Sequence, residues 1–325
     1  MKKVLTAILI ISFITTQAQV FKQKEPLVHT FSIVARDAAT GEMAVGVQSH
    51  WFSVGTAVPW ADAGVGAVAT QSFVDKSYGP KALSLLKKGY TAQEALDSLT
   101  RADAGRDVRQ VAIVDNKGNV AAHTGKKCIQ YANHITGINF SVQSNMMLGS
   151  KVCENMKTAF EQSAKKPLAE RVLLALEAAQ NAGGDIRGMQ SAALIVVPGK
   201  ATELWNNKTI DLRVDDNSKP LVELRRLYNT YLAYEHMNNG DLAVEKNDML
   251  LAMKEYNTAM KMFPQNLEMK YWTAITLANN KQIDKAATIL QTIYTKDKNW
   301  RELTKRLPAV GLLKVSELEL KKLTK

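Results

Sequence analysis

A chain of 325 residues is long enough for two domains of ordinary size. An apolar fraction of 46% and a charged fraction of 22% are typical of a globular protein and exclude an intrinsically disordered chain. The formal net charge of +11 favours an acidic partner, such as an anionic membrane surface or wall polymer, although lysines at helical spacing more often form a solvated face. No zinc-finger spacing, RNA-binding aromatic signature or basic stripe with interleaved aromatics occurs, so no nucleic-acid partner is expected.

The first residues, 1–18, are predicted to be a secretory signal peptide. Met1-Lys2-Lys3 is basic, Val4–Thr16 is an apolar run, and Thr16-Gln17-Ala18 provides a small-residue cleavage site. The apolar run is too short for a stable transmembrane helix, and no other run is long enough to span a bilayer. We therefore expect an exported protein, periplasmic or extracellular, without a transmembrane segment.

Residues 19–28 are predicted to be a linker, because Pro26 disfavours regular strand pairing nearby. The next residues alternate with period two from Thr30 to Arg36, which indicates a strand. A turn around Gly41 follows, and Met43–Ser49 is predicted to return as the second strand of a hairpin. Thr30 thus begins the first strand, where a threonine is often no more than a good strand former.

Strands and helices are then predicted in alternating groups. In chain order they are a strand at 64–72, helices at 78–88 and 91–99, strands at 108–114, 120–124 and 138–143, helices at 148–163 and 168–182, and strands at 191–197 and 210–214. This list indicates mixed α and β structure with antiparallel hairpins. Two sheets packed face to face, with a helical layer outside each, would bury these elements, so residues 29–219 are predicted to form one α+β domain.

The character of the chain changes near Pro220, and residues 220–325 are predicted to be all helical. A repeat with a spacing of 34 residues is similar to a tetratricopeptide helix–turn–helix repeat. Its matching positions are Ala252 with Ala286, Tyr256 with Leu290, and Ala259 with Ile293, with Pro264 closing the first copy. The match is partial, because Ile293 is not small and Lys298 replaces the second proline. We expect these helices to pack on the first domain or on a partner, either a cell-wall polymer or an envelope protein; a homo-oligomer stays open.

Cys128 and Cys153 could pair in an oxidising compartment, or Cys153 could be a small buried hydrophobe on a helix. Neither cysteine has a metal-ligand spacing, and no two histidines are four residues apart, so no metal site is expected. A G-x-S-x-G elbow, a P-loop and a dinucleotide-binding G-x-G-x-x-G are also missing, and no cofactor is expected.

Polar residues at strand ends or in loops are the candidates for a site. They are Thr30, Ser49, His50, Ser53, Thr70, Gln71, Ser72, Asp75, His123 and Asn145. For any one of them a structural role is the commoner one, because Ser and Thr cap turns and His often bonds a loop carbonyl.

Several long runs resemble, in order, the family known as domain of unknown function 1028. They are Thr30–Asp37, Val58–Gln71, Gln110–Asp115, Ala122–Gly125 and Gly183–Leu194, within a resemblance that covers about residues 29–238. The segment Asn299–Pro308 is similar to a C-terminal segment of family members that carry a region assigned to peptidoglycan binding.

The resemblance implies a fold and a mechanism, because this family is grouped with the N-terminal-nucleophile hydrolases. The implied fold is a four-layer αββα sandwich. Many family members begin Met-Thr-Phe-Ser, and Thr30 is the equivalent threonine here. The implied reaction is attack of Thr30 on an amide carbonyl, with its own α-amine, of pKa about 7.7–8.0, as general base. Backbone N–H groups or Asn145 would form the oxyanion hole, and the remaining candidates would contact substrate: Ser49, Ser53, Thr70, Gln71, Ser72 and Asp75.

This chain departs from the family pattern, because residues 19–29 still precede Thr30 after signal cleavage. Either a second, autocatalytic cleavage at His29–Thr30 frees the amine, or the chemistry is absent or uses His50 or His123 as base. The chain is therefore expected to be an exported amide hydrolase with Thr30 as nucleophile or, alternatively, a non-catalytic envelope module that binds peptidoglycan or a protein. A zinc hydrolase using His50 and His123 is a third, weaker hypothesis.

Overall fold

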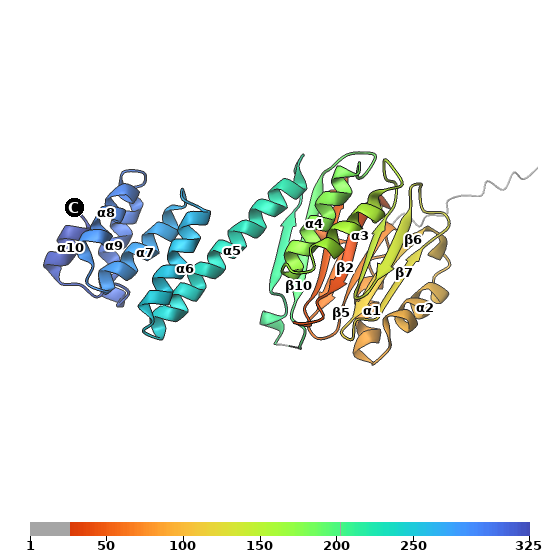
Figure 1. Cartoon of the computed structure of the whole chain (residues 1–325), viewed down its shortest axis with the longest axis horizontal. Helices are drawn as coiled ribbons and strands as arrows, with labels where there is room; N and C mark the ends of the chain where they lie inside the picture. Colours follow the sequence, from red (N-terminus) through yellow and green to blue (C-terminus); the bar gives the residue numbers. More distant parts are fainter. Residues whose placement is uncertain (1–26, 202) are drawn as a thin grey trace, which may run out of the picture. The chain divides into compact units, whose positions relative to one another are not determined.

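The computed structural model describes residues 27–201 and 203–325 of the chain, which form two compact units. The first unit ends at Leu224 and the second begins at Arg225, within helix α5 (Pro220–Glu245) (Figure 1). The expected signal peptide, 1–18, and most of the expected linker lie outside the described residues. The last two linker residues, Leu27–Val28, form the short strand β1 instead.

One antiparallel sheet of the first unit has the strand order β1-β5-β6-β7, with β4 also paired to β5. Its other strands are β4 (Pro59–Asp62), β5 (Gly66–Phe73), β6 (Arg109–Asp115) and β7 (Val120–Thr124). Helices α1 (Tyr78–Lys87) and α2 (Ala92–Ala102) cover its outer face. The contact is apolar: Val68, Val111 and Ile113 of the strands pack against Tyr78 and Leu96 of the helices.

The second antiparallel sheet has the strand order β11-β10-β3-β2-β9-β8. These strands are β2 (Thr30–Arg36), β3 (Met43–Ser49), β8 (Asn133–Gly137), β9 (Phe140–Ser144), β10 (Ser191–Val197) and β11 (Ile210–Val214). Helices α3 (Val152–Gln162) and α4 (Leu168–Asn181) pack on its outer face. Gly46 allows the close approach of α4, because a Cβ there would lie 2.3 Å from Val172 Cγ1.

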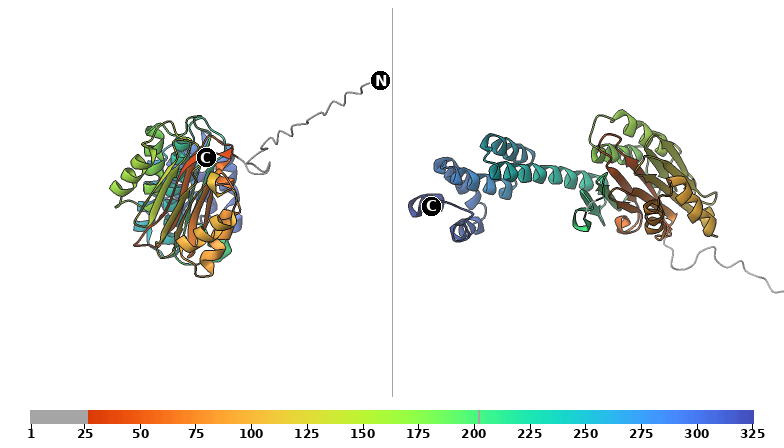
Figure 2. Two further views of the ribbon diagram at one scale, coloured as in Figure 1. Left: turned by 90° about the vertical axis from the view of Figure 1, so that its right-hand side faces the viewer. Right: turned by 90° about the horizontal axis from the view of Figure 1, so that it is seen from below.

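The two sheets face each other over a shared apolar core that includes Val34 and Val45 from one sheet and Ala69 and Ala112 from the other. The layers therefore run α1 and α2, first sheet, second sheet, α3 and α4 (Figures 1 and 2). The sequence-based prediction of mixed α and β structure with antiparallel sheets is confirmed. Three strands were not predicted: β1, β4 and β8. Asn133–Gly137 is a mainly polar edge strand with no buried residue, so it lacks the alternation that marks a half-buried strand.

The second unit is helical throughout, as predicted. After α5 it contains α6 (Met249–Met262), α7 (Leu267–Asn279), α8 (Ile283–Tyr294), α9 (Asn299–Arg306) and α10 (Glu317–Leu323). Side-chain caps fix several helix starts: Asp248 accepts from the Leu251 N–H and Asn266 from the Met269 N–H. Across the described part of the chain, no helix combines the length and apolarity needed to cross a membrane.

The two cysteines are free thiols, so the disulfide left open by the sequence does not form. Cys153 is buried with its sulfur 3.2 Å from Ser144 Oγ, and burial raises the pKa of its thiol to about 11. Cys128 Sγ lies 3.4 Å from the carbonyl oxygen of Arg109. Cys153 is thus a buried packing residue, the second of the two roles considered for it.

Candidate functional site

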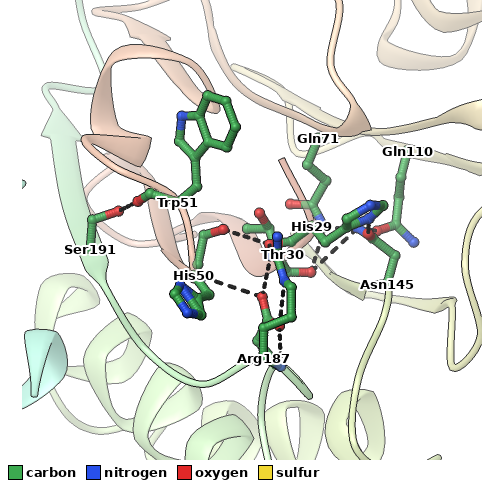
Figure 3. A network of polar contacts seen from close by, with 11 residues as sticks. His29, Thr30, His50, Trp51, Gln71, Gln110, Asn145, Arg187 and Ser191 are labelled. Carbon is green, nitrogen blue, oxygen red and sulfur yellow. Dashed lines mark hydrogen bonds and ion pairs between the residues drawn. The ribbon is translucent and has the colours of Figure 1, made fainter. Parts of the chain in front are cut away.

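Four polar residues form a row across neighbouring strands of the second sheet. The register places Ser191 of β10 opposite Ser49 of β3, and Ser49 opposite Thr30 of β2. Asn145 follows β9 directly, and its N–H donates to the carbonyl oxygen of Thr30 at 3.1 Å. Strand alternation puts Thr30 on the same face as Val34, which belongs to the core between the sheets. All four residues are fully buried, so the row lies in the interior, facing the first sheet. Figure 3 shows three of them, Thr30, Asn145 and Ser191, with their neighbours.

Side-chain amides from the first sheet fix this row. Gln71 Nε2 donates to the Thr30 carbonyl oxygen at 3.2 Å and to Gln110 Oε1 at 2.7 Å. Asn145 Nδ2 donates to the same Gln110 Oε1 at 2.9 Å, and Ser32 Oγ donates to Gln71 Oε1 at 2.6 Å. These buried amides satisfy one another across the space between the sheets, which rigidifies the backbone at Thr30.

The carbonyl oxygen of His29 accepts two hydrogen bonds at the peptide bond that precedes Thr30. Ser49 Oγ donates to it at 2.5 Å and Arg187 Nη2 at 3.0 Å. The Arg187 guanidinium is held in turn by Asp185, with Nε 3.0 Å from Oδ1 and Nη2 2.6 Å from Oδ2. The Asp185 side chain is fully buried, so the pair fixes the guanidinium plane. A neutral and a cationic donor on one carbonyl can stabilise negative charge that develops on its oxygen.

The His29 imidazole is fully buried beside this carbonyl. Its Nδ1 lies 2.6 Å from Asn145 Oδ1. Since Asn145 Nδ2 already donates to Gln110, Oδ1 faces the ring and Nδ1 must carry the proton. Burial lowers the pKa of His29, opposed in part by the bond to Asn145, so the neutral ring is favoured. The Phe73 ring meets the imidazole edge-on, with centroids 5.6 Å apart.

The segment before Thr30 belongs to the opposite sheet. Leu27 pairs with Phe73 and Val28 with Ser72 of β5, whereas the residues from Thr30 onward pair with β3 and β9. The chain therefore crosses between the sheets at His29, and the nitrogen of Thr30 is a peptide nitrogen in this form of the protein.

Thr30, Ser49, Gln71 and Asn145 are the predicted site residues that the structure brings together. The backbone N–H of His50 donates to Asp185 Oδ2 at 3.3 Å, which places His50 beside the group.

The other predicted residues lie elsewhere. Thr70 and Ser72 alternate with Gln71 along β5, so their side chains leave the opposite face of that strand. Ser53 Oγ donates to Asp215 Oδ1 at 2.7 Å in an exposed contact. Asp75 Oδ1 accepts from the Ser77 N–H at 2.9 Å, a turn role, and His123 Nε2 bonds the Arg106 carbonyl oxygen at 2.8 Å.

Several residues of the site were not identified from the sequence, among them His29, Gln110, Asp185 and Arg187. Arg187 and His29, whose carbonyl oxygen it contacts, are 158 positions apart in the sequence. A local sequence pattern cannot predict a contact between residues so far apart. A usable signal was present, since Asp185 and Arg187 lie in a loop flanked by Gly184 and Gly188, both with positive φ.

In the described part of the chain, no group of three or more His, Cys, Asp and Glu residues is arranged to hold a metal ion. The zinc hypothesis required His50 and His123 to act together. His123 pairs with Val111, which faces helices α1 and α2, whereas His50 directly follows β3 of the other sheet. The polar groups around Thr30 are amides, hydroxyls, the buried His29 imidazole and the ion pair between Arg187 and Asp185.

A family model described as "Family of unknown function (DUF1028)" matches residues 30–224. Among solved structures, the crystal structure of the DUF1028 protein SPO2555 from Silicibacter pomeroyi is 30% identical, with a TM-score of 0.57; the match covers 63% of this chain and 89% of that one. The Anbu (ancestral beta-subunit) protein from Yersinia bercovieri is 10% identical over 61% of this chain and 93% of that one, with a TM-score of 0.32. No curated protein matches the chain.

Proposed function

For a chain that belongs to the DUF1028 family of unknown function, we propose an exported, periplasmic or extracellular hydrolase of the N-terminal-nucleophile type, with Thr30 cleaving an amide bond. The layer order described above supports the four-layer αββα sandwich of such enzymes. One observation carries the proposal: the carbonyl of the bond before Thr30 is held by Ser49 and Arg187, as an oxyanion hole would hold it.

The first reaction is cleavage of the chain's own His29–Thr30 bond. The Thr30 hydroxyl attacks the carbonyl carbon of His29, and Ser49 and Arg187 stabilise the charge on the carbonyl oxygen. The C–N bond then breaks, the Thr30 nitrogen takes the hydroxyl proton, and an ester joins His29 to the Thr30 oxygen. Water hydrolyses this ester to leave a carboxylate on His29 and both a free amine and a free hydroxyl on Thr30.

The same groups then act on substrate. The Thr30 amine, with a pKa of about 7.7–8.0 in an unperturbed terminus, accepts the hydroxyl proton as the oxygen attacks an amide carbonyl. The substrate oxygen takes the place of the His29 carbonyl oxygen, against Ser49 and Arg187. The amine returns the proton to the leaving nitrogen, and water hydrolyses the acyl ester on Thr30. Asn145 and Gln71 hold the Thr30 carbonyl and so orient the nucleophile.

Three forms of the full-length chain test this proposal: wild type, Thr30→Ala and Thr30→Ser. Intact-mass measurements over time should show loss of the segment before residue 30 in the wild type and in Thr30→Ser, which keeps a hydroxyl. Thr30→Ala should stay uncut because it has no nucleophile. Cleavage of Thr30→Ala at the wild-type rate would overturn the proposal.

A second candidate is a non-catalytic envelope module that binds peptidoglycan or a protein. The peptide-bonded nitrogen of Thr30 favours it, and so do the helices of the second unit. Both copies of the 34-residue repeat are buried at matching positions, Tyr256 in one and Leu290 in the other. A Cβ at Gly240 of α5 would lie 2.4 Å from the Tyr256 ring of α6, so the two helices are in close contact at this point. This contact supports a tetratricopeptide-like helix pair. Sedimentation of an uncut, inactive chain with peptidoglycan would favour this function over the first.

A further inference from the structure

We infer that the substrate of this site is a peptide, bound in extended form along the edge of β5 that β1 occupies, with a ring-bearing residue before the bond that is cut. The inference rests on the proposed function and names its substrate class. Its basis is that the chain's own residues 27–29 lie on the acyl side of the His29–Thr30 bond, where the acyl part of a substrate must lie.

The backbone of this segment binds as an added strand. On one edge, β5 pairs along its length with β6. On its other edge β4 pairs with Gly66–Ala69, and β1 pairs antiparallel with Ser72 and Phe73. Within the described residues, which begin at Leu27, a two-residue ladder joins β1 to β5, so after cleavage the segment can leave and open this edge. A substrate peptide would restore the ladder through main-chain hydrogen bonds, which are independent of its side chains.

The residue before the cut bond has a site of its own. Asn145 Oδ1 accepts from the His29 ring at 2.6 Å, and the Phe73 ring packs against the imidazole in a T-shaped contact. The other ring nitrogen, Nε2, is buried without a partner among the described residues. The site therefore offers one acceptor and an aromatic wall. It fits a planar side chain that has one N–H or O–H donor, and an aliphatic side chain would leave Asn145 Oδ1 unbonded.

The charges around the cut bond fit a peptide product as well. Hydrolysis leaves a carboxylate at the position of the His29 carbonyl, where Arg187 Nη2 lies 3.0 Å away. Asp185 Oδ2 binds the same Nη2 at 2.6 Å and compensates much of the guanidinium charge. Arg187 can therefore bind a product carboxylate, but more weakly than it would if Asp185 did not compensate its charge.

The test uses protein that was expressed as the full-length chain and has cut its own His29–Thr30 bond. It compares kcat/KM for three chromogenic anilides: acetyl-His, acetyl-Val-His and acetyl-Leu-Val-His. We expect kcat/KM to rise about tenfold or more from the first to the third, and N-methylation of the Leu and Val nitrogens to remove that gain. Replacing His by Leu in the longest anilide should lower kcat/KM about tenfold, whereas Tyr should substitute for His. Thr30→Ala protein, which keeps residues 27–29 in place, is the control without turnover.

Each outcome decides one question. Equal kcat/KM for the short and the long anilides would overturn the peptide inference and leave the proposed hydrolase standing. A gain that survives N-methylation would overturn the added-strand binding mode. If intact mass shows that the His29–Thr30 bond is never cut and no anilide is turned over, the proposed function fails, and the inference fails with it.

Discussion

Replacing Ser49 by Ala should slow cleavage of the His29–Thr30 bond without disturbing the fold. Ser49 is fully buried, and its hydroxyl is one of two donors on the His29 carbonyl oxygen, 2.5 Å away. Removal of one oxyanion-hole donor typically costs about 100- to 1000-fold in rate, or about 2.7–4 kcal/mol of transition-state stabilisation. The stability cost should be smaller, about 1 kcal/mol, because Arg187 still donates to the same carbonyl oxygen.

The assay follows intact mass after cell-free synthesis of the full-length chain, with rates obtained from the fraction cut over time. Ser191→Ala is the matched control: Ser191 lies in the same row on the adjacent strand, but its hydroxyl bonds the backbone of Val54 and Trp51 rather than His29. We expect Ser191→Ala to be cut at the wild-type rate, even if its unfolding temperature falls. Cleavage of Ser49→Ala at the wild-type rate, or equal slowing of both variants, would refute the oxyanion-hole assignment.

Three further predictions concern pH and packing. In the uncut Thr30→Ala protein, the contribution of His29 to the free energy of unfolding should be fully present above pH about 6.5. It should be lost as the pH falls from there toward the lowered folded-state pKa of His29, since the unfolded chain then binds more protons. Denaturant titrations should show that a second change, His29→Asn, reduces the pH slope in this range, and an unchanged slope would argue against a neutral buried ring. Gly46→Ala should destabilise the first unit by about 1–3 kcal/mol, because the new methyl group would meet Val172, and an unshifted unfolding midpoint would contradict this packing. Gly240→Ala should destabilise the second unit by a similar amount in thermal unfolding, because the new methyl group would meet the Tyr256 ring. The rate of chain cleavage should stay that of wild type, and a slower cleavage would show that the two units are coupled.

The fold could be predicted from the sequence wherever apolar residues follow a clear period. The opening hairpin, the paired helices and the change to helices near Pro220 all have such a period, and all are present. Strand β8 could not be found because it is a polar edge strand. Strand β1 is only two residues long and was assigned to the linker because of Pro26, although its pairing with β5 depends on residues more than 40 positions away.

The site could be predicted only in its local part. Thr30, Ser49, Gln71 and Asn145 were candidates because they are polar residues at strand ends, and the registers bring them together. Thr70 and Ser72 were chosen with Gln71 from one run, but period-two alternation sends neighbours to opposite faces of a strand.

The most informative missed contact is that of Arg187 with the His29 carbonyl, which depends on a loop returning beside β2. Tertiary proximity of this kind is set by the packing of two sheets and is not encoded in any local spacing.

The central claim is that Thr30 becomes the amino terminus of the working protein. The most direct test is the N-terminal sequence and intact mass of the protein recovered from its native exported fraction. The account predicts a chain that starts at Thr30, with a free amine beside its hydroxyl. A mature chain that starts upstream of Thr30 and is not trimmed further would contradict it, because the nitrogen that must act as base would still be an amide.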